Sequence, residues 1–133
     1  MKIKYLQYSI IVISFIFVFL SCQNLSDEKN EEIITQKAPV LSFAVSSKSN
    51  NAISFKTKAS WYNGCGRFSH FTSTKTDSTF YITVFGTQSK NAICTQAFIE
   101  FDAPVTVSIS GRGNYTFKFW QTDSTSIDTT IIF

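Results

Sequence analysis

Apolar and polar residues alternate with a period of two over most of this chain, and no stretch shows a convincing helical period. The clearest runs are TFYITVFG, PVTVSIS and NYTFKFW. Because successive side chains of a strand point to opposite faces of a sheet, this alternation predicts strands with one buried face. Turn residues such as Ser49-Asn50-Asn51 and Asp77-Ser78 separate the runs. The pattern therefore predicts an all-β domain over residues 40–133, an antiparallel sandwich of seven or eight short strands.

Two of the turn signals make specific predictions about connections. Gly111-Arg112-Gly113-Asn114 lies between two strongly alternating runs and predicts a β-hairpin. Asp102-Ala103-Pro104 predicts a break between two further strands.

The N-terminal segment has a different composition. MKIKYLQY carries two lysines and no acid, and the run from Ser9 to Leu20 is uncharged and mostly apolar. A basic start, a short apolar run and a small residue at its end predict a secretory signal peptide over residues 1–21. A membrane-spanning helix is the alternative, because the uncharged stretch from Tyr5 to Ser21 is close to the lower limit for crossing a bilayer.

The end of the apolar run, FLSC, resembles the lipobox of bacterial lipoproteins, in which a small residue precedes a cysteine that becomes lipidated and N-terminal. The resemblance implies that Cys22 carries acyl chains such as palmitate, and several chains on one cysteine anchor a protein stably to a membrane. We therefore expect a lipoprotein of the bacterial cell envelope, held in the outer membrane on its surface or periplasmic side. The alternative is an ordinary secretory signal with a chance cysteine, or an uncleaved anchor.

The residues that follow Cys22 are polar and acidic. The segment QNLSDEKNEEIITQKAP cannot bury enough apolar surface to fold alone, so we predict a flexible tether over residues 22–39. Cleavage of the signal removes Lys2 and Lys4 from the 12 basic residues of the chain, which leaves a nearly neutral mature protein against its 9 acidic residues. The formal charge of +3 therefore gives no support for a nucleic-acid partner.

The chain has 3 cysteines, and lipidation of Cys22 leaves Cys65 and Cys94. Two remaining cysteines usually pair in an oxidising compartment. A disulfide between them would close a loop of roughly 30 residues and contribute about 3–4 kcal/mol to stability. Two separate free thiols are the alternative.

The stretch WYNGCGRFSH invites a catalytic interpretation, with Cys65 as nucleophile and His70 as base. Residues five apart in a strand lie about 16 Å apart and on opposite faces, and a disulfide-bonded cysteine cannot be a nucleophile. Two cysteines and one histidine also lack the paired spacing of zinc sites. Glu100 and Asp102 could flank a sugar or a calcium ion, or belong to a solvated strand face. We expect His70 on a sheet surface beside aromatic residues, and neither a metal, a cofactor nor enzyme activity.

Aromatic side chains are the remaining candidates for binding. Such residues, if they lie together on an exposed sheet, could stack on sugar rings or contact a protein partner. The alternative is that they fill a core. The candidates are Trp61, Tyr62, Tyr81, Phe85 and Trp120.

The combination of WYNGCG, AICTQA and GNYTFKFW downstream of FLSC looks like small Bacteroidetes-type lipoproteins with an immunoglobulin-like β-sandwich. The match covers roughly residues 60–133, and it implies a fold and a location but no activity. We therefore predict a non-enzymatic, membrane-anchored lipoprotein that presents a β-sandwich as a binding or interaction module for a protein or glycan ligand. A glycan-binding module that uses exposed aromatic residues is the sharper alternative, and an enzyme is the third.

Overall fold

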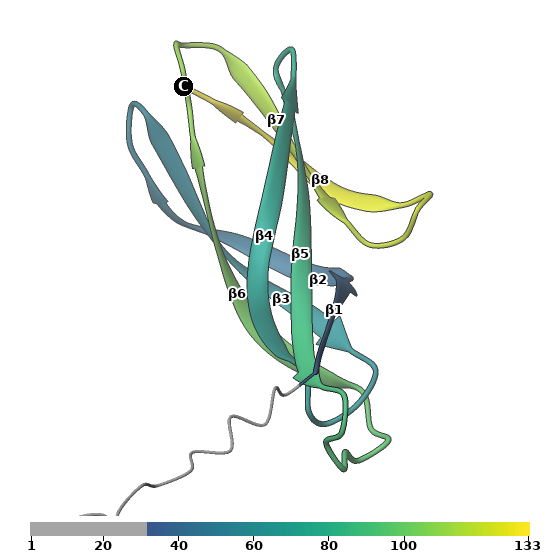
Figure 1. Cartoon of the computed structure of the whole chain (residues 1–133). Coiled ribbons are helices and arrows are strands. Elements are labelled where there is room, and N and C mark those ends of the chain that lie inside the picture. The colour runs from purple at the N-terminus through teal and green to yellow at the C-terminus, as the bar shows by residue number, and fades with distance from the viewer. Residues whose placement is uncertain (1–31) are drawn as a thin grey trace, which may run out of the picture. The chain divides into compact units, whose positions relative to one another are not determined.

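The computed structural model describes residues 32–133, so the predicted signal peptide, Cys22 and the first part of the tether lie outside the described residues. The described chain forms eight strands (Figure 1): β1 (Ile33–Ala38), β2 (Val40–Lys48), β3 (Ala52–Trp61), β4 (Arg67–Thr76), β5 (Thr79–Ser89), β6 (Ile99–Ser108), β7 (Asn114–Trp120) and β8 (Ser126–Ile132). No helix in this range is long and apolar enough to cross a membrane.

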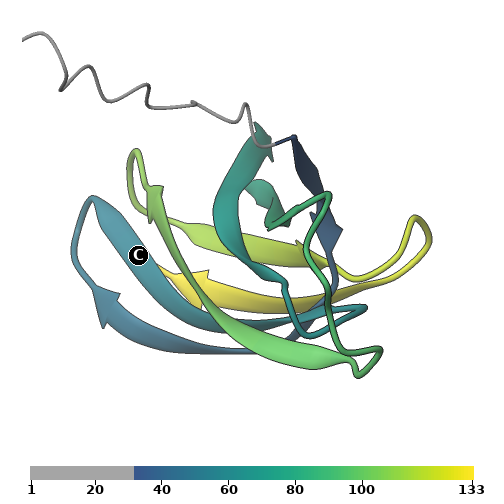
Figure 2. The ribbon, with the colours of Figure 1, turned by 60° about the horizontal axis from the view of Figure 1, so that its bottom comes forward.

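The strands form two sheets that pack face to face, as Figure 2 shows. In the three-stranded sheet, β3 lies between β2 and β6. In the five-stranded sheet, β5 is the central strand, and β4 pairs with one of its edges. The other edge of β5 is shared, because β1 pairs with its second half and β7 with its first half, and β8 lies beyond β7. All of these pairs are antiparallel except β5 with β7. The predicted β-sandwich of seven or eight strands is confirmed.

The core fills the space between the two sheets. Phe55 of β3 meets Phe117 and Phe119 of β7, with 5.1 Å between ring centroids in both pairs. The alternation read from the sequence assigns the inner faces of β5, β6 and β7 correctly, because the predicted inward residues are buried there. These are Phe80, Ile82, Val84, Val105, Val107, Ile109, Tyr115, Phe117 and Phe119.

The predicted tether is too long at its C-terminal end. Residues 33–38 form β1, which pairs with β5 from Ile33↔Ser89 to Ala38↔Val84. A strand of this kind is held mainly by backbone hydrogen bonds, so its side chains can remain polar and exposed. Pro39 then separates β1 from β2, which belongs to the opposite sheet.

Two predicted turns are also wrong. The segment at residues 102–104 does not break a strand, because β6 continues through Pro104. Proline is tolerated there since β6 is an edge strand and pairs only with β3. The segment 111–114 is not a hairpin, because β6 and β7 belong to different sheets. Gly111 and Gly113, with φ of 90° and 147°, instead redirect the chain from one sheet to the other.

Candidate functional site

The disulfide predicted between Cys65 and Cys94 is confirmed, with a Cα–Cα distance of 5.4 Å. It joins the loop after β3 to the loop after β5. Two hydrogen bonds also stabilise these loops. The Asn63 side chain accepts one from the Cys65 amide at 3.0 Å, and the Gly64 amide donates to the Thr95 carbonyl at 2.9 Å. Cys65 is therefore a covalent link between loops and has no free thiol.

His70 lies on the outer face of the five-stranded sheet, as predicted. Its ring stacks on Phe85 of β5, with 4.6 Å between centroids and 5° between planes. Glu100 and Asp102 are exposed on β6, and Asp102 forms an ion pair with Lys58 at 3.6 Å. Within residues 32–133 no three His, Cys, Asp or Glu side chains are grouped so that they could hold a metal ion.

Trp61 was a candidate for ligand binding, and the structure places it in the core with 2% of its surface exposed. A Cβ added at Gly66 would lie 2.1 Å from the indole, and one at Gly86 would lie 2.3 Å from it, so only glycine allows so close an approach at either position. The indole Nε1 donates a buried hydrogen bond of 2.7 Å to Gln88. Tyr62 stacks on the same indole at 5.1 Å and is itself 40% exposed. These two residues therefore do not belong to the sheet surface that carries the other candidates.

The other three candidate aromatic residues do lie on one surface. Tyr81 and Phe85 alternate with the buried residues of β5, and Trp120 alternates with those of β7. All three therefore lie on the outer face of the five-stranded sheet. We call them the aromatic face.

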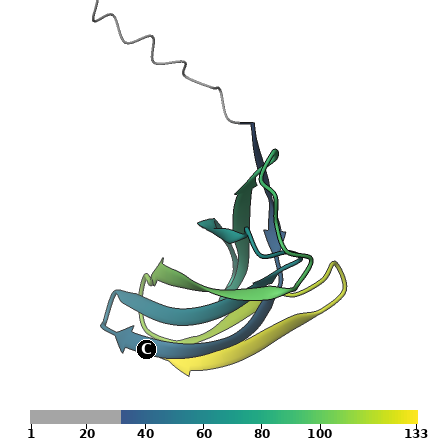
Figure 3. The same cartoon turned by 90° about the horizontal axis from the view of Figure 1, so that it is seen from below.

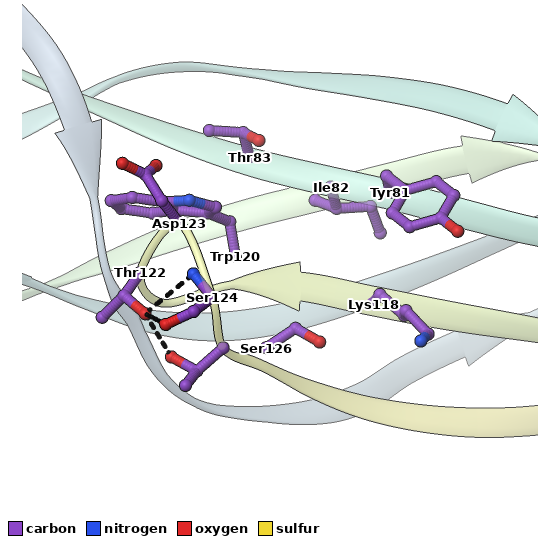
Figure 4. Close-up of a pocket in the computed structure, with 10 residues that line it drawn as sticks. Tyr81, Ile82, Thr83, Lys118, Trp120, Thr122, Asp123, Ser124 and Ser126 are labelled. Carbon is purple, nitrogen blue, oxygen red and sulfur yellow. Dashed lines mark hydrogen bonds between the residues drawn. The ribbon is translucent and has the colours of Figure 1, made fainter.

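A pocket of about 240 Å³ opens on this surface, beside the turn between β7 and β8 (Figure 4). Tyr81 and Lys118 occupy one side of it, and the indole of Trp120 forms the other. The turn contributes a rim of hydroxyl and carboxylate groups, from Thr122, Asp123, Ser124, Thr125 and Ser126.

Trp120 has an unusual environment within this pocket. Its Nε1 is buried, yet it has no hydrogen-bond partner among the described residues. The Nζ of Lys37 lies 5.0 Å from the ring centroid and also 3.6 Å from Asp123. The side chains of Lys37 and Asp123 are 49% and 92% exposed, so their ion pair contributes little and can open at small cost. An unpaired buried N–H costs about 1–3 kcal/mol. A ligand oxygen would recover this cost once the side chains around Nε1 move, because the atom itself is inaccessible in this conformation.

A comparison with known protein families identifies the family of this domain. The model of the ORF11 beta-sandwich domain matches residues 55–130. The chain belongs to this family. Comparisons with curated proteins and with solved structures gave no match. The part matched by the ORF11 family runs from within β3 to within β8, and it contains the disulfide, the aromatic face and every residue that lines the pocket.

Sequence reasoning missed the turn that forms the rim of this pocket, and it also missed the contact that Lys37 makes with Trp120. Lys37 lies on β1, in the segment that the sequence predicts as a tether, and the residues next to it in the sequence do not indicate a contact with Trp120. The turn between β7 and β8 that forms the rim is rich in serine and threonine, but so is the whole chain, so its composition does not mark it as a binding site. Its shape comes from local hydrogen bonds such as that between the Thr122 and Thr125 hydroxyls at 2.7 Å.

Proposed function

We propose that this protein is a non-enzymatic lipoprotein of the bacterial cell envelope, anchored through Cys22, that presents its ORF11 β-sandwich as a binding module. The N-terminal signal pattern and the FLSC motif support the anchor. The disulfide supports a location outside the cytosol, since such bonds persist in oxidising compartments. The same bond removes Cys65 as a nucleophile and so disfavours a thiol enzyme.

Metabolic labelling tests the anchor. Cells that express the full chain and are grown with labelled palmitate should incorporate label into the protein, because Cys22 is the proposed acylation site. The Cys22→Ser variant should lose the label completely. A double variant Cys65→Ser, Cys94→Ser is the matched control and should keep it. Label that persists in Cys22→Ser, or is absent from the unmodified protein, would contradict the anchor.

The binding role is proposed for the aromatic face rather than for the other sheet. The outer face of the three-stranded sheet carries polar and charged side chains such as Lys56, Lys58 and Asp102, and two of these already pair with each other. A pocket also opens on that sheet, beside Lys56, Asp102 and Pro104, but no aromatic ring lines it. The pocket of the five-stranded sheet is instead lined by the half-exposed Tyr81 and the partly buried Trp120. Exposed apolar surface of this kind normally marks an interaction site.

The ligand that fits this pocket best is a carbohydrate. The observation that carries this choice is the indole of Trp120, which combines a flat apolar ring with an unpaired N–H, surrounded by hydroxyl groups and one carboxylate. A sugar has apolar C–H faces that stack on aromatic rings and hydroxyl groups that can accept from the indole or donate to Asp123. Tyr81, which is 50% exposed, offers a second ring across the pocket.

A glycan array of bacterial and host oligosaccharides tests this choice, followed by calorimetric titration of the strongest ligand. Trp120→Ala should weaken its binding roughly 10- to 100-fold, because a large aromatic contact contributes about 1.5–3 kcal/mol. Trp120→Phe should lose less, since it keeps the ring but not the N–H. Tyr62→Ala removes an exposed aromatic residue outside the pocket and should leave affinity unchanged. An array without signal, or equal affinity for Trp120→Ala and the unmodified protein, would contradict a glycan site.

A further inference from the structure

We propose that the end of the sandwich at which β1 begins docks on the membrane surface, with Ile93 inserted between lipid headgroups. This inference rests on the proposed lipid anchor at Cys22. We call this part of the molecule the entry end, and it consists of the loop at residues 62–66, the loop at residues 90–98 and the first residues of β1. In Figure 3, which views the molecule from below, the start of β1 lies beside the loop after β5.

The entry end collects exposed apolar side chains. Ile93 is fully exposed, Phe98 is 79% exposed and Ile33 is 55% exposed. With Tyr62, these are four of the eight large apolar residues that are exposed within residues 32–133. A soluble domain gains nothing from exposing so many apolar side chains at one end, so the cluster indicates an interaction surface.

The disulfide holds Ile93 in this exposed position. Ile93 immediately precedes Cys94, which is bonded to Cys65 in the neighbouring loop. On the other side of Ile93, the Lys90 amide donates to the Glu32 carbonyl at 2.8 Å, and the Lys90 side chain pairs with the Glu32 carboxylate at 2.7 Å. The loop backbone is therefore tied to the protein before and after Ile93, which limits its movement toward the core.

The position of the proposed anchor selects a membrane as the partner. Glu32 lies ten positions after Cys22, so this connection spans at most about 36 Å even when fully extended. Glu32 lies at the entry end, because Ile33 pairs with Ser89 at the end of β5. Acylation of Cys22 would therefore keep the entry end, rather than the opposite end with the turns at residues 49–51 and 77–78, close to the lipid surface.

The charges of the entry end favour insertion by apolar side chains rather than electrostatic attraction. Lys90 and Glu32 are exposed there, and the adjoining first residues of β4 and β6 add the exposed Arg67 and Glu100. These two positive and two negative charges cancel, so they attract anionic lipids only weakly. Apolar side chains, in contrast, can enter the boundary between headgroups and acyl chains. Contact should therefore depend weakly on salt concentration.

Quenching by brominated lipids tests the docking. The full lipidated protein is placed on vesicles of phosphatidylethanolamine and phosphatidylglycerol, with or without bromine on the acyl chains. Two variants each add one tryptophan: Ile93→Trp at the entry end, and Ile132→Trp as the matched control. Ile132 is 68% exposed and lies at the end of β8, where its carbonyl accepts a hydrogen bond from Lys48, beside the turn at residues 49–51 of the opposite end. The emission of the unmodified protein, from Trp61 and Trp120, is subtracted.

Brominated lipid should lower the emission added by Ile93→Trp roughly twofold or more, because residues inserted at the interface lie about 5–10 Å deep, within reach of the acyl chains. The emission added by Ile132→Trp should not change. Flotation of the same samples separates the two proposals. If the protein floats with the vesicles but Ile93→Trp is not quenched, the docking is overturned and the anchor stands. If the protein does not float, the anchor fails and the docking with it. Photocrosslinking from position 93 to a protein instead of lipid in intact envelopes would also overturn membrane docking.

Discussion

Trp61→Ala is expected to lower the free energy of unfolding by about 3–5 kcal/mol, which is the usual cost of removing a buried large aromatic side chain. Trp61 is 2% exposed, and Gly66 and Gly86 both approach its indole too closely for a side chain at either position. The substitution leaves a cavity that neither glycine can fill, and it leaves the buried Gln88 side chain without its hydrogen bond from Nε1. Urea unfolding of the mature chain in a Cys22→Ser background, followed by circular dichroism, measures the effect.

Tyr62→Ala is the matched control for this experiment. Tyr62 stacks on the same indole but is 40% exposed, so its loss should cost no more than about 1.5 kcal/mol. Equal destabilisation by the two substitutions would contradict the core position of Trp61. It would also return Trp61 to the candidate binding residues.

Removal of the disulfide should have an effect nearly as large. The double variant Cys65→Ala, Cys94→Ala is expected to lose about 3–4 kcal/mol, because the bond closes a long loop and so restricts the unfolded chain. Cys65 and Cys94 are 29 positions apart, and that separation sets the size of the loop. For a domain of this size, each kcal/mol lowers the melting temperature by about 4–8 °C. Thermal unfolding in the same Cys22→Ser background measures the loss.

Reduction provides the control for the disulfide. The chain with both cysteines should melt at the temperature of the double variant once a reductant has opened the bond, whereas the double variant should not respond to the reductant at all. A melting temperature that is the same with and without reductant, together with an alkylation assay that detects open thiols, would show that the bond does not stabilise the fold.

The sequence predicts those parts of this fold that bury one face of a strand. The inward residues of β5, β6 and β7 follow the alternation closely, because one-sided burial imposes a period of two. The errors lie where backbone pairing decides the structure. β1 buries few side chains, so its polar residues resemble a tether, and Pro104 resembles a breaker although it lies on an edge strand. The segment 111–114 has the composition of a hairpin, and only the pairing of its flanking strands shows that it joins two sheets.

The candidate site was predictable only in part, for a related reason. Alternation indicates that Tyr81, Phe85 and Trp120 point away from the core, since all three occupy strand positions. Only the pairing of β5 with β7 places them on one sheet. Trp61 lies on the same face of β3 as Ile53 and Phe55, so continued alternation would have placed it in the core. The close approach of Gly86, 25 positions away, is not visible in any local pattern. The contact between Lys37 and Trp120 joins strands far apart in the chain, so no short motif could reveal it.

The shared edge of β5 also constrains the order in which the chain can fold. β1 occupies one half of that edge early in the sequence, but the other half stays open until β7 is available. β7 supplies Phe117 and Phe119, which lie at the centre of the core and are fully buried. A growing chain that ends before residue 114 contains β1 to β6 but lacks the β7 side chains that fill the space between the two sheets. Completion of this domain therefore waits for β7, because the parallel pair with β5 cannot form before the strand that begins at Asn114 is available.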